Sequence, residues 1–309
     1  MKTGQDIAIL IPCYNEALTI GQVVKDFRHH LPHAKIYVYD NNSTDQTIEQ
    51  AQHAGAEVRL EPQQGKGNVV RRMFADIEAD LYILVDGDAT YEAKAAIEGI
   101  KKLNSGPYDL VNIKRIHTQS EAYRFGHVFG NKLLTGLVKL FFKSNSDDML
   151  SGYKIFTKRF VKSFPALSSG FEIETELLIH TLELKLPFGE IDAPYYARPE
   201  GSESKLKTYS DGIRIVKLIL FFIKEEKPLL FFGIACLFLA SISILLGMPI
   251  VITFLETGLV PRLPTAVMAV GIMLTAILSL MCGLILDSIA RGRKEIKRFQ
   301  YLNFTHKDS

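Results

Sequence analysis

The sequence predicts an α/β domain with a mainly parallel sheet covered by helices on both faces, then an interfacial amphipathic helix and a C-terminal transmembrane hairpin. Up to about residue 205, short apolar runs alternate with helical patterns through short links, which is typical of a parallel sheet with crossover helices. Further along, Leu229 to Leu255 and Leu263 to Leu286 contain no charged residue. Each of these runs exceeds the roughly 20 residues that a helix needs to cross a bilayer.

Composition excludes several classes of protein. A formal charge of +2 over 309 residues gives no global case for nucleic-acid binding. Three scattered cysteines, Cys13, Cys236 and Cys282, form neither a disulfide framework nor a zinc-binding spacing, which fits a reducing compartment. The first residues lead directly into a strand-like run, without the apolar region and cleavage site of a signal peptide.

Four strands are expected in the first domain, the first of them a buried parallel strand, and helical patterns follow the first three. The predicted strands are 6–11, 36–40, 56–60 and the run ending in Asp86, and a strand-like run follows at 110–113. Helices are expected through about His29 and through about Ala54, and Gly65-Lys66-Gly67 opens a third that carries Arg71 and Arg72.

Polar clusters terminate three of these strands, at residues 12–16, 40–45 and 86–90. Parallel strands end at one edge of the sheet, so all three clusters should meet there. Asp86 and Asp88 are two apart and can converge on one cation. Oxygen-only ligands suit Mg²⁺ or Mn²⁺, with a substrate phosphate completing the shell. A solvated Asp-Gly turn is the alternative.

A nucleotide lying across this edge would meet all three clusters. Asp40 would accept a hydrogen bond from a base N–H, and Glu16 would accept from ribose hydroxyls. Gly65 and Gly67 would allow close backbone approach, with Lys66 or Arg71 near phosphate. Each residue alone has an alternative role in a helix cap or turn. The chain lacks G-x-x-x-x-G-K-[ST] and G-x-G-x-x-G, so neither a P-loop ATPase nor a dinucleotide enzyme is indicated.

The motifs, taken in order, resemble those of family 2 glycosyltransferases, which have the GT-A Rossmann-like fold and use nucleotide-sugar donors. The series continues past the metal loop in a form similar to the polyprenyl-phosphate glycosyltransferases, relatives of dolichol-phosphate mannose synthase. The resemblance covers about residues 6 to 210 by motif, and its motifs are Ile11-Pro12-Cys13-Tyr14-Asn15-Glu16, Asp40-Asn41-Asn42-Ser43-Thr44-Asp45, Gly65-Lys66-Gly67, Asp86-Gly87-Asp88, Asp148-Met149-Leu150-Ser151-Gly152-Tyr153-Lys154, Gly170-Phe171-Glu172-Ile173-Glu174 and Arg198-Pro199-Glu200-Gly201-Ser202-Glu203-Ser204-Lys205.

Two departures and one absence qualify the resemblance. Tyr153-Lys154 replaces the usual Phe-Arg and keeps one aromatic ring and one cation. Asn41-Asn42 replaces the commoner Asp-Gly and makes the base harder to read. The chain has no tryptophan and so lacks the Q-x-x-R-W motif of processive polysaccharide synthases, which favours transfer of a single sugar.

The resemblance implies roles for individual residues. Asp86 and Asp88 would hold the metal, and Asp148 and Asp88 would be catalytic. Cations downstream of the metal loop, Arg115, Arg124, Arg198 and Lys205, would bind the lipid phosphate. The donor would contact Pro12, Tyr14, Glu16, Asp40, Lys66, Gly67, Asp86 and Gly87.

The expected reaction is direct displacement at the anomeric carbon, with inversion, by an oxygen of the lipid phosphate. Asp148 is the family's candidate base, with Asp147 beside it as an alternative. A phosphate monoester has its second pKa near 6 and is mostly a dianion at neutral pH. Asp148 is therefore also expected to orient the acceptor phosphate or neighbouring lysines.

Charge predicts the arrangement at the membrane. In the expected helix from Tyr209 to Lys227, Arg214, Lys217 and Lys224 share one face, which suits a helix in the membrane interface; ordinary packing is the alternative. Basic residues flank both long apolar runs, so the positive-inside rule places both termini and the large domain in the cytoplasm, at the inner (plasma) membrane. The predicted parts are a GT-A catalytic domain (1–208), the interfacial helix (209–227), two transmembrane helices (228–290, as about 228–255 and 263–287) and a basic tail (291–309).

The expected activity is transfer of one hexose from a nucleotide sugar, UDP-glucose or a related UDP-hexose, to undecaprenyl phosphate for cell-surface glycan modification, such as lipopolysaccharide or cell-wall glycan. A GDP-mannose enzyme of the dolichol type is the alternative within the class. A nucleotidyltransferase and a non-catalytic membrane scaffold are alternatives outside it. The resemblance also implies a homo-oligomer, because relatives form tetramers.

Overall fold

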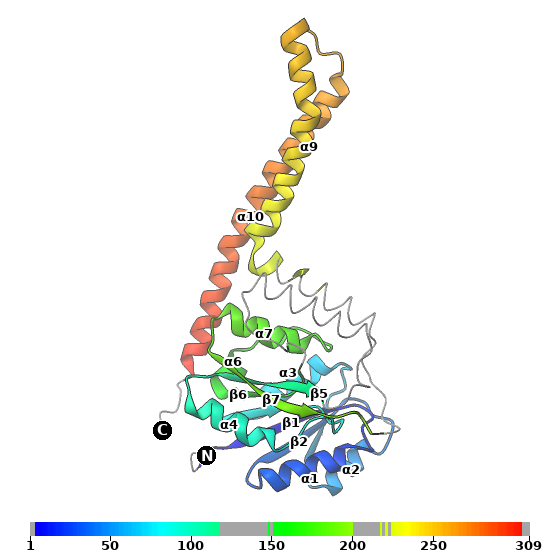
Figure 1. Ribbon diagram of the computed structural model, residues 1–309, viewed down its shortest axis with the longest axis vertical. Helices are drawn as coiled ribbons and strands as arrows, with labels where there is room; N and C mark the ends of the chain where they lie inside the picture. Colours follow the sequence, from blue (N-terminus) through cyan, green and yellow to red (C-terminus); the bar gives the residue numbers. More distant parts are fainter. Residues whose placement is uncertain are drawn as a thin grey trace. The chain divides into compact units, whose positions relative to one another are not determined.

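The computed structural model describes residues 4–117, 148, 151–199, 217, 220–221 and 224–304. It divides into a sheet unit, Met1–Val216 with Lys297–Ser309, and a hairpin unit, Lys217–Ile296. Of the predicted interfacial helix at 209–227, only residues 217, 220–221 and 224–227 are described. Figure 1 traces the elements of each unit.

The sheet unit is built on seven strands in the order β3-β2-β1-β4-β6-β5-β7. Neighbouring pairs are parallel except at β6, which runs antiparallel to both β4 and β5. The strands are β1 (Ile7–Cys13), β2 (Lys35–Asp40), β3 (Glu57–Leu60), β4 (Leu81–Leu84), β5 (Leu110–His117), β6 (Lys154–Thr157) and β7 (Phe188–Tyr195).

Helices cover both faces of this sheet, and alternation along the strands divides the core between them. Ile9 and Ile11 of β1 belong to one buried cluster, and Ala8 and Leu10 belong to the other. The first cluster packs against α1 (Ile20–His30), α2 (Thr47–His53) and α4 (Ala95–Ser105), and the second against α3 (Lys66–Asp76), α6 (Lys158–Ser163) and α7 (Ile173–Glu183).

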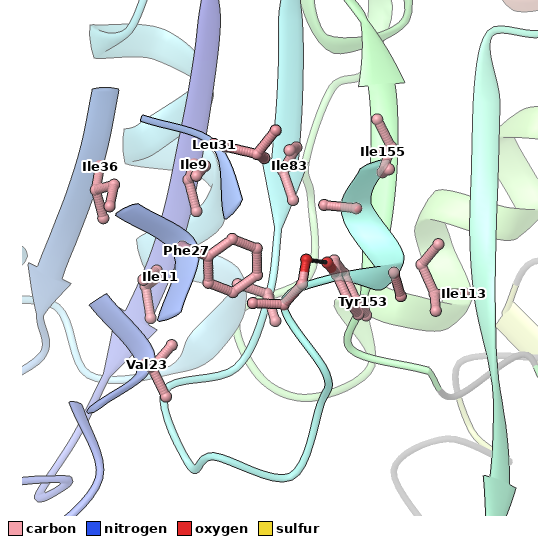
Figure 2. Packing of buried hydrophobic residues seen from close by; sticks show 14 of the residues in the cluster. Ile9, Ile11, Val23, Phe27, Leu31, Ile36, Ile83, Ile113, Tyr153 and Ile155 are labelled. Carbon is pink, nitrogen blue, oxygen red and sulfur yellow. Dashed lines mark hydrogen bonds between the residues drawn. The ribbon is translucent and has the colours of Figure 1, made fainter. Parts of the chain in front are cut away.

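Figure 2 shows the first cluster, in which the ring of Phe27 from α1 lies among isoleucines of the sheet. Tyr153, just before β6, closes this cluster on one side. Its ring packs edge-on against Phe27 at 6.0 Å between centroids, and its hydroxyl donates to the carbonyl of Ala93 at 3.5 Å (Figure 2).

The predicted fold class is confirmed, since strands fall at all four expected positions and helices follow each. The fourth strand ends at Leu84, two residues before the predicted end, so Asp86 and Asp88 lie in the loop that follows. The antiparallel β6 was not predicted. Its four residues, Lys154–Thr157, are all buried although the first is a lysine.

The hairpin unit consists of α9 (Pro228–Thr257) and most of α10 (Leu263–Asn303). Both helices are long and apolar enough to cross a membrane, and within their most apolar windows only 6% and 17% of residues are buried. The Ser243 hydroxyl donates to the Ala269 carbonyl at 2.7 Å, and the Ser279 hydroxyl donates to the Phe232 carbonyl at 3.1 Å. These bonds join the two helices as a hairpin.

The last turns of α10 belong to the sheet unit. The Tyr301 hydroxyl, on a residue only 6% exposed, donates to Asp109 Oδ2 at 2.7 Å, and the guanidinium of Arg159 lies 4.8 Å from the Tyr301 ring centre. Lys297 pairs with Glu183 at 2.7 Å. The second apolar helix was predicted to end near residue 287, but helix-forming Lys, Arg and Glu residues carry it on to Asn303.

Candidate active site

The three polar clusters meet at the carboxyl ends of β1, β2 and β4, as the parallel topology requires. The Asn15 amide donates to Ser43 Oγ at 2.8 Å, and the Glu16 amide donates to Thr47 Oγ1 at 2.8 Å, which joins the first cluster to the second. The Thr19 hydroxyl donates to the Gly87 carbonyl at 2.7 Å, which joins the first to the third. The clusters therefore form one site at one edge of the sheet.

Asp40, the last residue of β2, presents an unused acceptor at this edge. Asp40 is only 2% exposed, and its Oδ2 accepts a hydrogen bond from the Ser43 amide at 3.0 Å. Oδ1 is buried without a hydrogen-bond partner in the described part of the chain. A buried carboxylate oxygen without a donor is costly, so this atom is set to accept from a ligand N–H.

Asn41 and Asn42 hold the loop beside Asp40. The Asn41 amide group donates to the carbonyls of Glu61 and Gln63 at 2.8 and 2.9 Å and accepts from the Gly65 amide at 2.7 Å. Asn42 has a left-handed φ of 66°, which asparagine tolerates better than most residues. Asn42 therefore adopts a backbone conformation that is also open to the glycine of the commoner Asp-Gly.

Asp88 is buried and holds a cation. Its Oδ1 accepts from the Thr90 hydroxyl at 2.6 Å, and its Oδ2 lies 2.5 Å from Arg198 Nη2. Arg198 Nη1 also lies 3.7 Å from Glu16 Oε1, so one guanidinium bridges two acids from different strand ends. Burial and the charge of Asp86 raise the pKa of Asp88, although Arg198 opposes that shift.

Asp86 is held on both sides. Its Oδ1 lies 2.5 Å from Lys66 Nζ, and the same ammonium lies 2.5 Å from Glu174 Oε1. Burial would lower the pKa of Lys66, but the two carboxylates outweigh burial and raise it. On the other side, a Cβ added to Gly152 would meet Asp86 Oδ2 at 2.2 Å. Only glycine leaves room for the carboxylate in this position.

The donor set at this edge fits a hard divalent cation. Asp86 and Asp88 offer only oxygen atoms, and four carboxylates here, on Glu16, Asp40, Asp86 and Asp88, add to burial in raising the pKa of the Cys13 thiol. No group of three or more His, Cys, Asp or Glu residues with metal-binding geometry occurs among the described residues. That Asp86 and Asp88 hold the ion, with oxygens of a bound diphosphate completing its shell, stays a prediction.

Asp148 forms a bidentate pair with Arg115 of β5. The Nε–Oδ2 and Nη2–Oδ1 distances are both 2.7 Å, and the Arg115 amide also donates to Oδ2 at 3.2 Å. Burial would raise the pKa of Asp148, but the bonds and charge of Arg115 outweigh burial and lower it. A carboxylate held this way is a weak base and a strong positioning group.

This pair lies beside the rings of Tyr195 and Tyr91. Arg115 Cζ is 5.5 Å from the Tyr195 ring centre, and the two tyrosine rings meet edge-on at 5.1 Å. The Gly152 amide donates to Tyr91 Oη at 2.8 Å, and Gly152 also packs against the carboxylate of Asp86. The predicted acceptor side and donor side are therefore adjacent.

Lys154, which replaces the usual arginine of the resembled motif, is fully enclosed. Its ammonium donates to Asn112 Oδ1 at 2.9 Å and to the Ser151 carbonyl at 2.6 Å. Burial lowers its pKa to about 8, although Glu174 and Asp148 oppose that shift.

Two glycines predicted at the donor phosphate have a packing role. A Cβ on Gly65 would meet the Ser169 carbonyl oxygen at 2.2 Å, and one on Gly67 would meet the Ser168 carbonyl oxygen at 2.1 Å. The Gly67 amide also donates to Ser169 at 3.0 Å. These contacts explain both glycines, and donor binding by Gly67 stays a prediction.

The other predicted residues vary in placement. Pro12 lies in β1, Tyr14 follows the strand with 36% of its surface exposed, and Gly87 packs on Cys13, whose sulfur would lie 2.7 Å from an added Cβ. The Arg71 guanidinium donates to Asn68 Oδ1 at 2.8 Å on its own helix. Arg124, Asp147 and Lys205 lie outside the described residues.

Glu174, Thr90 and the tyrosine pair Tyr91 and Tyr195 were given no role from the sequence. Glu174 belongs to one of the resembled motifs, but nothing in its spacing indicates that it shares Lys66 with Asp86. Thr90 follows Asp88 by two residues, a spacing at which a hydroxyl can bond back to a carboxylate.

Comparison with known proteins agrees with this geometry. The model of glycosyl transferase family 2 matches residues 8–164, half of the chain. Glycosyltransferase AglJ of Haloferax volcanii is 30% identical over 305 residues, covering 98% of this chain and all of that protein. The dolichyl-phosphate hexose transferase of the same organism is 25% identical over 225 residues, 73% of this chain and 97% of that one.

A solved structure shares the fold. Glucosyl-3-phosphoglycerate synthase from Mycobacterium tuberculosis, in complex with Mn²⁺, UDP-glucose and phosphoglyceric acid, superposes with a TM-score of 0.59 at 20% identity, covering 71% of this chain and 80% of that one. The resemblance carried by the ordered motifs is confirmed. With its sheet, its strand-end acids and these matches, the chain belongs to glycosyl transferase family 2.

Proposed function

We propose that this glycosyltransferase moves one hexose from a nucleotide sugar to a polyprenyl phosphate, with UDP-hexose as the donor and undecaprenyl phosphate as the acceptor. The observation that carries the donor half is the site at the ends of β1, β2 and β4. There, the unpartnered Asp40 Oδ1 and the Asp86–Asp88 pair lie on one sheet edge. Asp40 would accept from the base, and the acid pair with a divalent ion would hold the diphosphate.

The acceptor half rests on charge and on the hairpin. Arg115 lies next to the donor site, in contact with Tyr195, and Arg198 reaches the same edge. α9 and α10 are apolar and mostly exposed, which suits lipid surroundings. A relative is named for hexose transfer to a dolichyl phosphate. The hairpin would cross the membrane with the sheet unit on the cytoplasmic side, where positive charges flank it.

In this proposal the protein orients two anions and lets the acceptor attack. A phosphate dianion is already a nucleophile at neutral pH, so strong base catalysis is not needed. Asp148 fixes the Arg115 guanidinium, which would hold the acceptor phosphate for in-line attack and inversion at the anomeric carbon. A divalent ion at Asp86 and Asp88 would stabilise the negative charge of the departing nucleotide.

The test incubates the purified full chain in detergent with undecaprenyl phosphate, Mg²⁺ and a panel of UDP- and GDP-sugars. Mass spectrometry of the extracted lipid then identifies donor and product together. Asp88→Asn is expected to lose at least about 100-fold in rate because it weakens the site for the ion. Asp26→Asn, at a partly exposed carboxylate that accepts a hydrogen bond from Gln22 away from the site, is the matched control.

A lipid-linked monosaccharide from one donor supports the proposal, and a GDP-mannose product selects the dolichol-type alternative. If no donor gives a lipid-linked sugar, the proposal fails. If Asp88→Asn retains the rate of the unaltered chain, the donor site is elsewhere.

A further inference from the structure

Arg198 binds the acid that the divalent ion would need. Its Nη2 lies 2.5 Å from Asp88 Oδ2, and its Nη1 lies 3.7 Å from Glu16 Oε1. The two carboxylates are only 4% and 8% exposed, whereas the Arg198 side chain is 26% exposed. A partly exposed cation thus neutralises two buried acids.

The other oxygen of Asp88 is already engaged, because Oδ1 accepts from both the hydroxyl and the amide of Thr90, at 2.6 and 3.2 Å. Oδ2 is therefore the oxygen through which Asp88 would reach an ion. Mg²⁺ binds carboxylate oxygens at about 2.1 Å, and a guanidinium at contact distance from the same oxygen would repel the ion. Arg198 and the ion compete for one atom.

Lys66 and Arg198, the cations that contact Asp86 and Asp88, differ in how exposed their side chains are. Lys66 lies between Asp86 and Glu174, with only 8% of its side chain exposed, so it keeps a carboxylate when one is lost to a ligand. Arg198 lies three residues beyond the end of β7, and 26% of its side chain is exposed. The Tyr196 amide donates to the Thr90 carbonyl at 3.0 Å, and Tyr195 bridges to Tyr91. The chain up to Tyr196 is pinned beside Asp88, and Arg198 is two residues beyond.

We propose that Arg198 exchanges with the divalent ion. The guanidinium holds Asp88 and Glu16, and binding of the ion at Asp88 Oδ2 displaces it. The displaced guanidinium is then available to the phosphate of the acceptor, so the metal and donor bind before the lipid. This ordering rests on the proposed function, whereas the exchange itself concerns only the protein and the ion.

The exchange can be measured without donor, lipid or turnover. Calorimetric titration of the full chain in detergent with Mg²⁺ gives the dissociation constant, and Arg198→Gln is expected to lower it roughly three- to tenfold by removing the competitor. Arg198→Lys keeps a charge with fewer donors and should fall between. Arg72→Gln, which removes an exposed cation from α3, should leave the constant unchanged.

Displacement of Arg198 can be followed by tryptophan fluorescence, because the chain contains no tryptophan of its own. Tyr196→Trp, at a residue 43% exposed, places a single fluorophore beside Arg198. Mg²⁺ should shift its emission saturably, and the shift should vanish when Arg198→Gln is added. Farnesyl phosphate should bind more tightly with Mg²⁺ than without it, and Arg198→Gln should reduce that ratio.

The proposal is overturned if Arg198→Gln leaves the Mg²⁺ constant unchanged or raises it, or if no variant binds Mg²⁺. An emission shift that persists in the Arg198→Gln background also overturns it. Sugar transfer to lipid with an unchanged Mg²⁺ constant would reject the exchange and keep the proposed function. Exchange of Arg198 with Mg²⁺ but no sugar transfer to any lipid would keep the exchange and reject the proposed function.

Discussion

Gly152 determines where the carboxylate of Asp86 lies. Since an added Cβ would meet Asp86 Oδ2 at 2.2 Å while Lys66 holds Oδ1, the carboxylate cannot retreat without breaking an ion pair. Gly152→Ala should therefore weaken Mg²⁺ binding at least about tenfold, measured by calorimetry, while the far-ultraviolet circular dichroism stays unchanged.

Gly21 of α1 is the matched control for this substitution. A Cβ there would meet nothing nearer than 3.8 Å, so Gly21→Ala should leave Mg²⁺ binding as it is. Equal Mg²⁺ affinity in the Gly152→Ala and Gly21→Ala chains would show that ion binding by Asp86 does not depend on the space that Gly152 leaves beside it.

Asp148 is predicted to position Arg115 rather than to accept a proton. Asp148→Asn breaks a bidentate buried pair, so the acceptor KM should rise about tenfold or more, with a smaller loss in kcat. Because the pKa of Asp148 is lowered, its ionisation should not appear in the rate profile above pH 5. Near-full turnover of Asp148→Asn would exclude a base role, and an unchanged acceptor KM would exclude the positioning role.

His180 makes the sheet unit sensitive to acid. Burial lowers its pKa to about 3, while in the unfolded chain the group protonates near 6.5. Between these values only the unfolded state binds the proton, so stability falls as pH decreases through that range, by about 1.4 kcal/mol per unit below pH 6.5.

The comparison that isolates this effect uses His180→Leu, which cannot titrate. Denaturant unfolding at pH 7.5 and pH 5 should show a larger loss in the unaltered chain than in the variant, whatever their relative stabilities at pH 7.5. Equal losses would mean that His180 is protonated in the folded protein.

Residue types at the site followed from the sequence more readily than their pairings did. Asp40, Asp86 and Asp88 were expected at one edge because each follows a recognisable apolar strand. The partners of Lys66 and Arg198 were not, because a long cationic side chain can reach several acids and burial selects among them. Both were expected at phosphates, and in the ligand-free chain both hold carboxylates.

At the scale of elements, local pattern predicted the first four strands and non-local pairing decided the rest. β1, β2 and β4 contain apolar runs that end in turn residues, and the shorter β3 alternates charged and apolar residues. β6 has four residues and a buried lysine, and it fits the sheet only because Lys154 finds Asn112 of β5 and the Ser151 carbonyl. No signal within that segment indicates that it runs antiparallel between β4 and β5.

The end of α10 is predicted to stabilise the sheet unit through Tyr301. Its hydroxyl donates to Asp109, a fully buried residue that also pairs with Arg159. Tyr301→Phe removes one donor from a buried carboxylate and should lower the free energy of unfolding by about 1–3 kcal/mol. Phe299→Tyr, at an exposed position on the same helix, is the control, and equal stability of the two variants would contradict the prediction.

For the whole molecule, the sheet unit is not continuous in sequence, because Lys297–Ser309 belongs to it. A chain truncated before Tyr209 should leave the membrane fraction, since it lacks the predicted interfacial helix and both apolar helices, but should also unfold at lower temperature. A free peptide of residues 294–304 should partly restore its melting temperature, and the same peptide with Tyr301→Phe should restore less. An unchanged melting temperature after truncation would contradict this.

The Tyr301–Asp109 bond can form only some time after Asp109 has been translated. Its partners are 192 positions apart, with both apolar helices between them. At about 5–20 residues per second, a ribosome takes on the order of 10–40 s to cover that distance. During that interval Asp109 has been translated and Arg159 follows 50 residues later, but Tyr301 has not been translated, so the nascent sheet unit lacks this buried donor until the hairpin has been translated. Premature termination anywhere in the hairpin would therefore leave a sheet unit less stable than the complete one and more readily cleared by cellular proteases.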